Sequence, residues 1–203
     1  MLSFQDFVAS AARSGTVVNL LFEKQVFALV GTLDRIVKVL EQAGISYELV
    51  GGMAVFVHVN KVEQMAARNT KGIDLLIRRD DLHRIAETTQ AAGFVFRHTA
   101  GVDMLLWQGD RNNPIYFVFA GEKTRPEQPH PNPKLAPVRE RLHDSDFWVI
   151  PVADLVRMKL SSNRLRDQVQ IQDMDEVGLI TPQVESRLPL DLSERLEVIR
   201  QQQ

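Results

Sequence analysis

Two glycines and one aspartate are the residues of this chain whose types and spacing are best suited to chemistry. Gly51 and Gly52 follow the short apolar run 47–50, and Asp74 lies within a second apolar run, 73–77. Glycines between a strand and a helix let a ligand approach the backbone and leave N–H groups free at the helix start, a geometry suited to phosphate. A carboxylate inside a buried strand requires a cation or hydrogen-bond donors nearby, so Asp74 indicates a metal ion or a charged partner. The alternative for the two glycines is a tight turn that binds nothing.

These residues belong to a longer pattern, Val50-Gly51-Gly52-Met53-Ala54 followed by Arg68-Asn69-Thr70-Lys71-Gly72-Ile73-Asp74-Leu75-Leu76. The pattern resembles the signature of the nucleotidyltransferase superfamily, including its stand-alone bacterial members grouped with abortive-infection toxins. That signature is a Gly-Gly turn after a strand and, further along, Arg-x-Thr-x-Asp-hydrophobic-Asp-hydrophobic. The chain departs from it at one position, because Gly72 stands where the family has the first of its two paired aspartates.

In this family the paired aspartates point to one face of a strand and hold two magnesium ions against a nucleotide triphosphate. The resemblance therefore implies an α+β fold, with a mixed β-sheet flanked by helices and with helical N- and C-terminal extensions. It implies that Asp74 is the catalytic and metal-binding carboxylate. A third carboxylate normally comes from a later strand, but the matching segment 115–119 has none, so we consider Asp103 and Glu122 as substitutes. Nucleotide-binding roles are implied for Gly51, Gly52, Arg68, Thr70, Lys71 and Lys159.

A helix predicted over 152–170, with Pro151 at its start, carries the last of these candidates. In the family a lysine followed by an Arg-x-x-Asp pair supports the nucleotide phosphates and braces the fold; Lys159, then Arg164 or Arg166 with Asp167, match that pattern. We expect the Lys159 side chain to be free to contact an anionic ligand, because leucines already supply the inward face. The alternative is a solvated helix with internal ion pairs, each contributing roughly tenths of a kcal/mol.

Hydrophobic periodicity and turn residues predict the remaining elements. Residues 17–30 predict one helix, and the apolar spacing from Leu33 to Leu40 predicts a second, with Thr32 as its N-cap and Gly44 as its stop. The chain then divides into N-terminal helices over 1–45, a core over 46–150 and a helical region over 151–203. Strands are predicted at 47–50, 73–77, 94–98, 102–107 and 115–119, in one mixed sheet.

Residues 121–137 hold five of the nine prolines and predict an irregular surface segment. A segment of this kind either connects two parts of the fold or lies across a binding site. Glu122, Lys123 and Arg125 are the side chains that would act if it lies across the site.

Composition excludes several classes of protein. The 203 residues are 44% hydrophobic and 25% charged, which is ordinary for a globular domain. A net charge of -2 argues against a large basic surface, so nucleic acid would need a local patch. The chain has no cysteine, which excludes disulfides, thiolate zinc sites and cysteine nucleophiles. No apolar run reaches the roughly 18 residues of a membrane span and no signal peptide is recognisable, so we expect a cytoplasmic protein without a membrane partner.

Two classes of function follow from these observations. The first is a nucleotidyltransferase that binds a nucleotide triphosphate with magnesium and transfers a nucleoside monophosphate to a hydroxyl on RNA, protein or a small molecule. The second is a catalytically degenerate member that keeps the fold as a binding or regulatory module, in a setting of the toxin–antitoxin type. A homo-oligomer or a protein partner stays open in both. A second carboxylate within reach of Asp74 would distinguish them, because metal-assisted transfer depends on carboxylates that position the ions.

Overall fold

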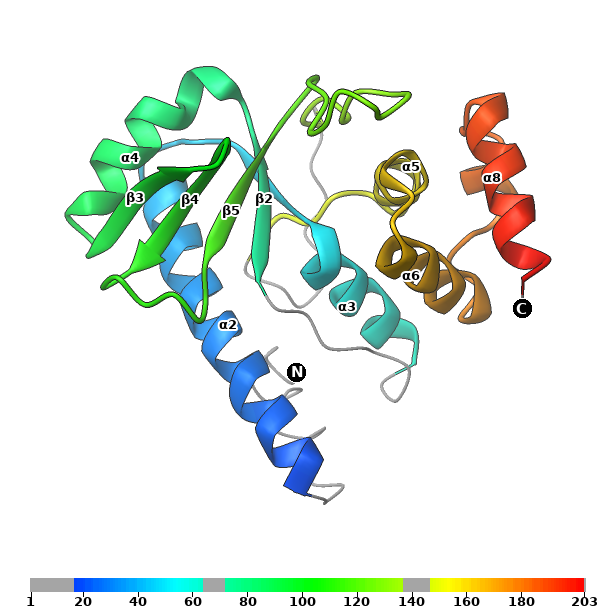
Figure 1. The fold of residues 1–203 in the computed structure, drawn as a ribbon. Coiled ribbons are helices and arrows are strands. Elements are labelled where there is room, and N and C mark those ends of the chain that lie inside the picture. The colour runs from blue at the N-terminus through cyan, green and yellow to red at the C-terminus, as the bar shows by residue number, and fades with distance from the viewer. Residues whose placement is uncertain (1–16, 64–71, 137–146, 203) are drawn as a thin grey trace.

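Five strands form one mixed sheet, and helices lie behind it and beside it (Figure 1). The computed structural model describes residues 17–63, 72–136 and 147–202, with side chains from residue 27 onward. The predicted α+β class and all five predicted strands are confirmed. The strands are β1 (Tyr47–Val50), β2 (Ile73–Ile77), β3 (Phe94–Thr99), β4 (Val102–Trp107) and β5 (Ile115–Phe119), in the order β1-β2-β5-β4-β3. The helices are α2 (Val17–Gln42), α3 (Gly51–Val62), α4 (Leu82–Gln90), α5 (Val152–Ser162), α6 (Leu165–Glu176), α7 (Pro182–Glu185) and α8 (Leu190–Arg200), with a 3₁₀ turn at Arg79–Asp81 before α4.

The register of the sheet places one row of side chains across it. β2 runs antiparallel to β1 and parallel to β5, and β4 is antiparallel to both of its neighbours. Asp74 pairs with Val50 on one side and Tyr116 on the other; Tyr116 pairs with Met104, and Met104 with Arg97. Side chains paired in register point to the same side of a sheet. We call the side that carries these five residues the Asp74 face.

The opposite side of the sheet is the main core. Its residues Ile73, Leu75 and Leu105 have no solvent exposure. Helices α2 and α4 lie behind this side in Figure 1, and the Arg35 guanidinium of α2 stacks 4.1 Å from the centre of the Trp107 ring. Apolar side chains at alternate strand positions therefore pack against the apolar stripe of α2. Because alternate residues of a strand point to opposite sides, this burial fixes the side of the sheet to which Asp74 points.

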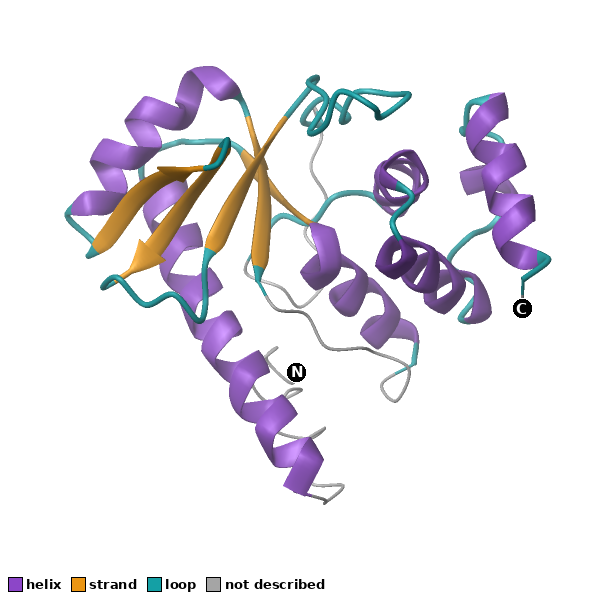
Figure 2. Ribbon diagram, viewed as in Figure 1, coloured by secondary structure: helices purple, strands orange, loops and turns teal. Residues whose placement is uncertain are grey.

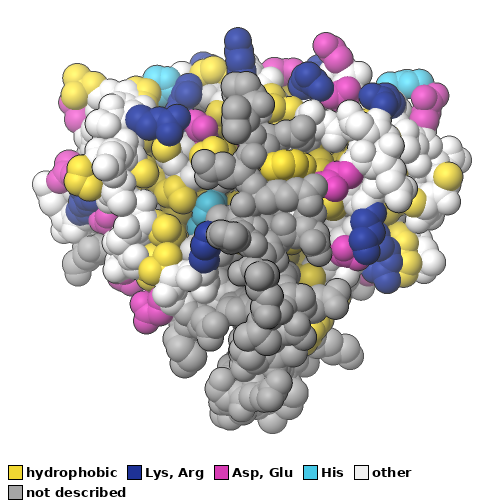
Figure 3. Space-filling view, turned by 180° about the vertical axis from the view of Figure 1, so that it is seen from behind, with side chains coloured by type: hydrophobic (Ala, Val, Ile, Leu, Met, Phe, Trp, Pro, Cys, Tyr) yellow, Lys and Arg dark blue, Asp and Glu magenta, His cyan; other side chains and the backbone are white. Residues whose placement is uncertain are grey.

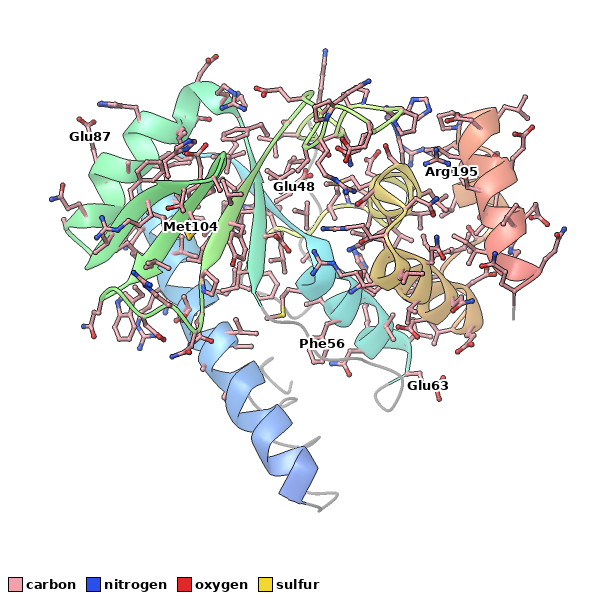
Figure 4. All side chains as sticks on the ribbon, in the orientation of Figure 1. Glu48, Phe56, Glu63, Glu87, Met104 and Arg195 are labelled. Carbon is pink, nitrogen blue, oxygen red and sulfur yellow. The ribbon has the colours of Figure 1, made fainter. Side chains whose placement is uncertain are left out.

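The Asp74 face is covered unequally. Over β1 it is closed: Glu48 and Val50 are buried, and the Ala136 N–H donates to Glu48 Oε1 at 3.0 Å. Over β5 and β4, Tyr116 and Met104 are only partly buried. Figure 4 shows Met104 on the sheet, at a distance from α3, α5 and α6, whereas Glu48 lies toward α5. Among the described residues, the Asp74 face is therefore less covered at Tyr116 and Met104 than over β1.

The N-terminal helical region differs from the prediction. Residues 17–42 form one continuous helix, so the predicted start at Thr32 is wrong. Thr32 lies inside the helix, where its hydroxyl donates to the Ala28 carbonyl at 2.9 Å. That bond satisfies a side chain which otherwise favours a helix start. The apolar stripe of Leu29, Leu33 and Leu40 runs through the predicted boundary and is fully buried, and it holds the two halves together.

The helix predicted over 152–170 is in fact two helices, so that prediction is wrong. α5 ends at Ser162 because Asn163 adopts a left-handed conformation, with φ 49° and ψ 31°. Asparagine tolerates this conformation better than most residues, and it ends a helix as glycine does. A capping box between Arg164 and Asp167 then starts α6. The break turns Arg164 and Asp167 back toward Lys159.

Residues 120–136 form an irregular segment, as predicted, and contact three parts of the fold (Figure 2). The Arg125 guanidinium donates to the Ser162 carbonyl at 3.0 Å, at the C-terminal end of α5. His130 Nε2 lies 2.9 Å from the Asp191 carboxylate at the start of α8. Asn132 donates to the Phe119 carbonyl at 3.1 Å, at the end of β5. The segment therefore connects the sheet to the C-terminal helices.

On the side of the molecule opposite to Figure 1, lysine and arginine side chains are interspersed with acidic ones (Figure 3). This mixture agrees with the small net charge of the chain. Within the described residues, the search for a helix with the length and hydropathy of a membrane span found none.

Arg200 at the end of α8 joins three helices, and its replacement tests how the C-terminal region is held. It donates to Asp175 of α6 at 2.8 Å and to Glu185 of α7 at 2.6 Å. We expect Arg200→Ala to lower the free energy of unfolding by about 2 kcal/mol, because it removes charge-assisted hydrogen bonds that are partly shielded from water. Thermal or urea unfolding measures this. The control is Arg97→Ala, which removes an exposed guanidinium bonded only to the neighbouring Phe96 carbonyl among the described residues. Equal effects of the two substitutions would contradict this account.

Candidate functional site

The centre of the site is a close contact between the Asp74 side chain and the Gly51 backbone. A Cβ atom placed on Gly51 would lie 2.0 Å from Asp74 Oδ2 and 2.7 Å from its Cγ. Gly51 also has a φ of 69°, which disfavours any residue with a side chain. Glycine is required here for two independent reasons. The Gly51 backbone thus lies directly against the Asp74 side chain, and the expected approach of a ligand to the Gly51-Gly52 turn stays a prediction.

Asp74 lies at the start of α3, where the helix backbone offers free donors. Gly51 is the first residue of α3, and the preceding Val50 supplies no side-chain cap. The first four N–H groups of a helix have no partner within it and carry partial positive charge. His58 holds the other end of α3, through a 2.8 Å hydrogen bond from Nε2 to the Ile150 carbonyl. The turn therefore presents N–H groups beside a carboxylate on a helix of fixed orientation.

Three cations act on the Asp74 carboxylate. Burial raises the pKa of Asp74, while the positive charges of Lys159, Arg166 and Arg164 act to lower it. A pKa raised by burial means that the charged form of the acid is less stable in the folded protein than it would be in water. Acids with shifted pKa values are frequent at binding and catalytic sites, because burial of a carboxylate does not by itself stabilise a fold. Asp74 with its surrounding cations is therefore the strongest candidate site among the described residues.

Lys159 is buried and ion-paired, so the prediction of a free side chain is wrong. Its Nζ donates to Asp167 Oδ1 at 3.1 Å, and the side chains of the two residues are 8% and 1% exposed. Arg164 Nε donates to the other carboxylate oxygen at 2.7 Å. Although burial acts to raise it, hydrogen bonds from Arg164 and Ser162 and the charge of Lys159 lower the pKa of Asp167 to about 2. Burial lowers the pKa of Lys159, opposed by Asp167 and Asp74.

These contacts divide the basic residues by role. Lys159 and Arg164 brace α5 against α6 through Asp167, as the family resemblance implied for this motif. Arg166 is exposed, and it makes no ion pair or side-chain hydrogen bond with any residue in the described ranges. Arg166 is thus the cation near Asp74 that is available to a ligand. The sequence prediction placed Arg166 on the same helix as Lys159 and favoured Lys159, because the turn at Asn163 was not foreseen.

The positions that flank Asp74 on its own face hold Gly72 and Tyr116. Tyr116 pairs with Asp74 in register and lies in the strand where the family places its third carboxylate. A Cβ atom on Gly72 would lie 3.1 Å from Tyr116 Cε2, so the tyrosine ring occupies the space beside Gly72. The phenol hydroxyl makes no hydrogen bond with the described part of the chain. Sequence reasoning looked for an acid in 115–119 and missed the tyrosine; the strand register is the signal that identifies it.

Asp103 and Glu122 do not complete a carboxylate set with Asp74, so these two expectations are wrong. Asp103 precedes Met104 on β4 and therefore points to the opposite side of the sheet, where its Oδ1 lies 2.7 Å from His98 Nδ1. Glu122 follows β5 beyond Phe119, which pairs with Ile77 at the far end of β2 from Asp74. Its carboxylate accepts a two-pronged hydrogen bond from Arg79, with distances of 2.6 and 2.7 Å.

Among the described residues, the acidic groups near Asp74 do not form the shared carboxylate set of a two-magnesium site. Magnesium requires an octahedron of oxygen ligands that normally includes one or two carboxylates, and a two-ion site needs shared ones. Asp167 is already engaged by Lys159 and Arg164. Within the described residues no three acidic or histidine side chains are grouped closely enough to hold a metal ion. Three other predicted nucleotide-binding residues, Arg68, Thr70 and Lys71, lie outside the described residues.

The contact between Gly51 and Asp74 is testable by a double-mutant cycle. We expect Gly51→Ala to destabilise the protein by about 3 kcal/mol, because the new methyl group overlaps Asp74 and takes a strained φ. Gly44→Ala is the matched control: its φ is 64°, but no atom lies within 4 Å of the added Cβ. We expect about 1 kcal/mol there, from strain alone. In the Asp74→Ala background, Gly51→Ala should cause a smaller loss in urea unfolding. An unchanged loss would show that the two residues are not in contact.

A second experiment compares single substitutions in a buried and an exposed Lys–Asp pair. We expect Lys159→Ala to lower the free energy of unfolding by about 3 kcal/mol, because Asp167 stays buried without one of its partners. Lys38, whose Nζ lies 2.9 Å from Asp34, is 66% exposed. Lys38→Ala should lower the same quantity by less than about 0.5 kcal/mol. Similar losses for both substitutions, measured by thermal and urea unfolding, would mean that Lys159 does not brace the fold.

Comparisons with known proteins support the fold. No protein-family model matches the chain, and no curated protein matches its sequence. A crystal structure of an antigenic nucleotidyltransferase-like protein from Paracoccidioides brasiliensis aligns with a TM-score of 0.54 and 15% identity, over 100% of this chain and 90% of that one. The solution structure of the antibiotic-resistance factor ANT(2'')-Ia aligns at 0.47 and 10% identity, over 87% and 84% of the two chains, a score too low to add support. On the strength of the first alignment and of the sheet topology, the chain has a nucleotidyltransferase-like fold.

Proposed function

We propose that this protein binds a nucleotide triphosphate at the start of α3 and acts as a binding or regulatory module rather than as a two-metal nucleotidyltransferase. The observation that carries the proposal is the contact between Asp74 and the Gly51 backbone at the start of α3, where the charges of Lys159, Arg164 and Arg166 act on the Asp74 carboxylate. These groups combine donors for phosphate with a carboxylate suited to hydroxyl groups. The nucleotidyltransferase-like fold supports a nucleotide as the ligand.

The ligand chemistry follows from the charges that surround the site. Lys159, Arg164 and Arg166 oppose Asp74 and Asp167, which leaves one formal positive charge in excess. Helix α3 adds the partial positive charge of its N-terminus. An anion is therefore favoured over a neutral or cationic ligand. Asp74, in turn, accepts hydrogen bonds and suits a ligand that carries both phosphates and hydroxyls, as nucleotides do.

The transferase is the competing function, and the arrangement of carboxylates argues against it. Transfer of a nucleoside monophosphate places negative charge on attacking and leaving oxygens, and a pair of metal ions held by shared carboxylates stabilises that charge. This chain offers Asp74 with Gly72 and Tyr116 at the flanking positions. A role in a toxin–antitoxin system, a homo-oligomer or a protein partner would be compatible with a binding module.

Binding of labelled nucleotides tests the proposal. We expect fluorescent triphosphates of the four bases, titrated against the purified protein, to show saturable binding in at least one case. Arg166→Ala should weaken it about tenfold, because it removes a charged contact to phosphate. Lys38→Ala, an exposed cation on the helix behind the sheet, is the matched control and should leave binding unchanged. No saturable binding of any of the four, with or without magnesium, would refute the proposed function. Magnesium-dependent release of pyrophosphate would instead support the transferase.

A further inference from the structure

The site differs from a metal-dependent one at two positions that neighbour Asp74. Gly72 immediately precedes β2, two residues before Asp74, and Tyr116 pairs with Asp74 on β5. Both positions share the Asp74 face. Neither side chain supplies a negatively charged oxygen, and the tyrosine ring fills the space above Gly72. The chain therefore carries a neutral hydrogen-bond donor where a magnesium ligand would be needed.

The phenol hydroxyl is also available. Tyr116 is partly exposed on the Asp74 face, and its hydroxyl has no hydrogen-bond partner within the described ranges. A tyrosine in such a position presents a ring for stacking and a donor for an anionic oxygen. By contrast, Tyr47 on β1 is fully buried, and its hydroxyl contacts Glu41 Oε1 at 3.1 Å. Tyr47 serves the core, whereas Tyr116 faces outward beside the candidate site.

We propose that the site binds the phosphates of its ligand without a divalent metal ion, with the Tyr116 hydroxyl contacting the ligand directly. This inference rests on the proposed function and adds the mode of recognition. A metal ion usually bridges a carboxylate and a phosphate, so that both negative groups bind the same cation. Without that ion, the positive charge must come from the protein. Of the cations that act on Asp74, Arg166 is the exposed one without an ion pair in the described residues.

The charge of Asp74 has opposite consequences in the two modes of binding. In a metal site the carboxylate holds the ion, and its loss weakens nucleotide binding. In a metal-free site the same carboxylate repels the phosphates. Replacing it with a neutral amide of the same shape should therefore not weaken the binding of the nucleotide. Asp74→Asn therefore separates the two modes even though both place Asp74 at the centre.

Titration of fluorescently labelled ATP in EDTA and in magnesium buffer tests this inference. We expect the natural protein to bind equally in both buffers. Tyr116→Phe, which removes only the hydroxyl, should weaken binding about fivefold in both. Asp74→Asn should bind at least as tightly as the natural protein in EDTA. Tyr116→Asp, which places a second carboxylate beside Asp74, should bind ATP more tightly in magnesium than in EDTA.

A second readout does not depend on the nucleotide. Electron paramagnetic resonance of manganese measures free ion directly, and Tyr116→Asp should bind manganese more tightly than the natural protein. Thermal unfolding checks that each variant is folded, and Lys38→Ala serves as the control for charge. Magnesium-dependent binding by the natural protein that is lost in Asp74→Asn would overturn the inference while leaving the proposed function standing. An unchanged affinity in Tyr116→Phe would also overturn it. Absence of binding of all four triphosphates in both buffers would refute the proposed function and this inference with it.

Discussion

The contact between the Asp74 carboxylate and the Gly51 backbone is the constraint around which the site is arranged. It requires a residue without a side chain at the exact point where β1 becomes α3, and it requires β2 to present Asp74 to that point. The pairing of Val50 with Asp74 supplies the second requirement, because it sets the two strands in register. Burial of Ile73 and Leu75 on the other side fixes the direction of the Asp74 side chain. Packing of the hydrophobic core on one side of β2 thus positions the Asp74 carboxylate on the other side.

A second constraint comes from the buried ion pair between α5 and α6. Two cations that act on Asp74, Lys159 and Arg164, are held by Asp167, and only a chain reversal at Asn163 brings them together. Buried ion pairs add little net stability compared with apolar packing, but they fix geometry because a misplaced partner is strongly unfavourable. Here the fixed geometry places positive charge at the start of α3. The same residues therefore brace the fold and set the electrostatic potential of the site.

Much of the fold could be predicted from the sequence, because alternating apolar residues and glycine turns are local signals. All five strands were predicted to within one residue, and Gly51 and Asp74 were both singled out, although the contact between them was not predicted. The errors came from interactions between distant residues. One continuous helix replaced two because Thr32 found a carbonyl within the helix, and one helix became two at Asn163. Lys159 was expected to be free because leucines already supply the inward face of its helix, but the turn at Asn163 brings Asp167 to it.

The identity of the groups beside Asp74 depended most on tertiary structure. Asp103 and Glu122 were reasonable by position in the chain, but strand alternation and an ion pair with Arg79 exclude them. The sheet register, in contrast, identifies Tyr116, a residue that a search for acids passes over. Where the family motif has paired aspartates, the described residues beside Asp74 are a glycine and a phenol, and this difference is the basis of the proposed metal-free site.

A crystal structure grown with ATP and manganese tests the central claim most directly, because manganese is located by its anomalous scattering. The account predicts phosphate density at the start of α3, beside Gly51, Tyr116 and Arg166, without an anomalous peak at Asp74. An anomalous peak within about 2.5 Å of the Asp74 carboxylate, bridging it to the phosphates, would contradict the account and restore the metal-dependent interpretation of the site.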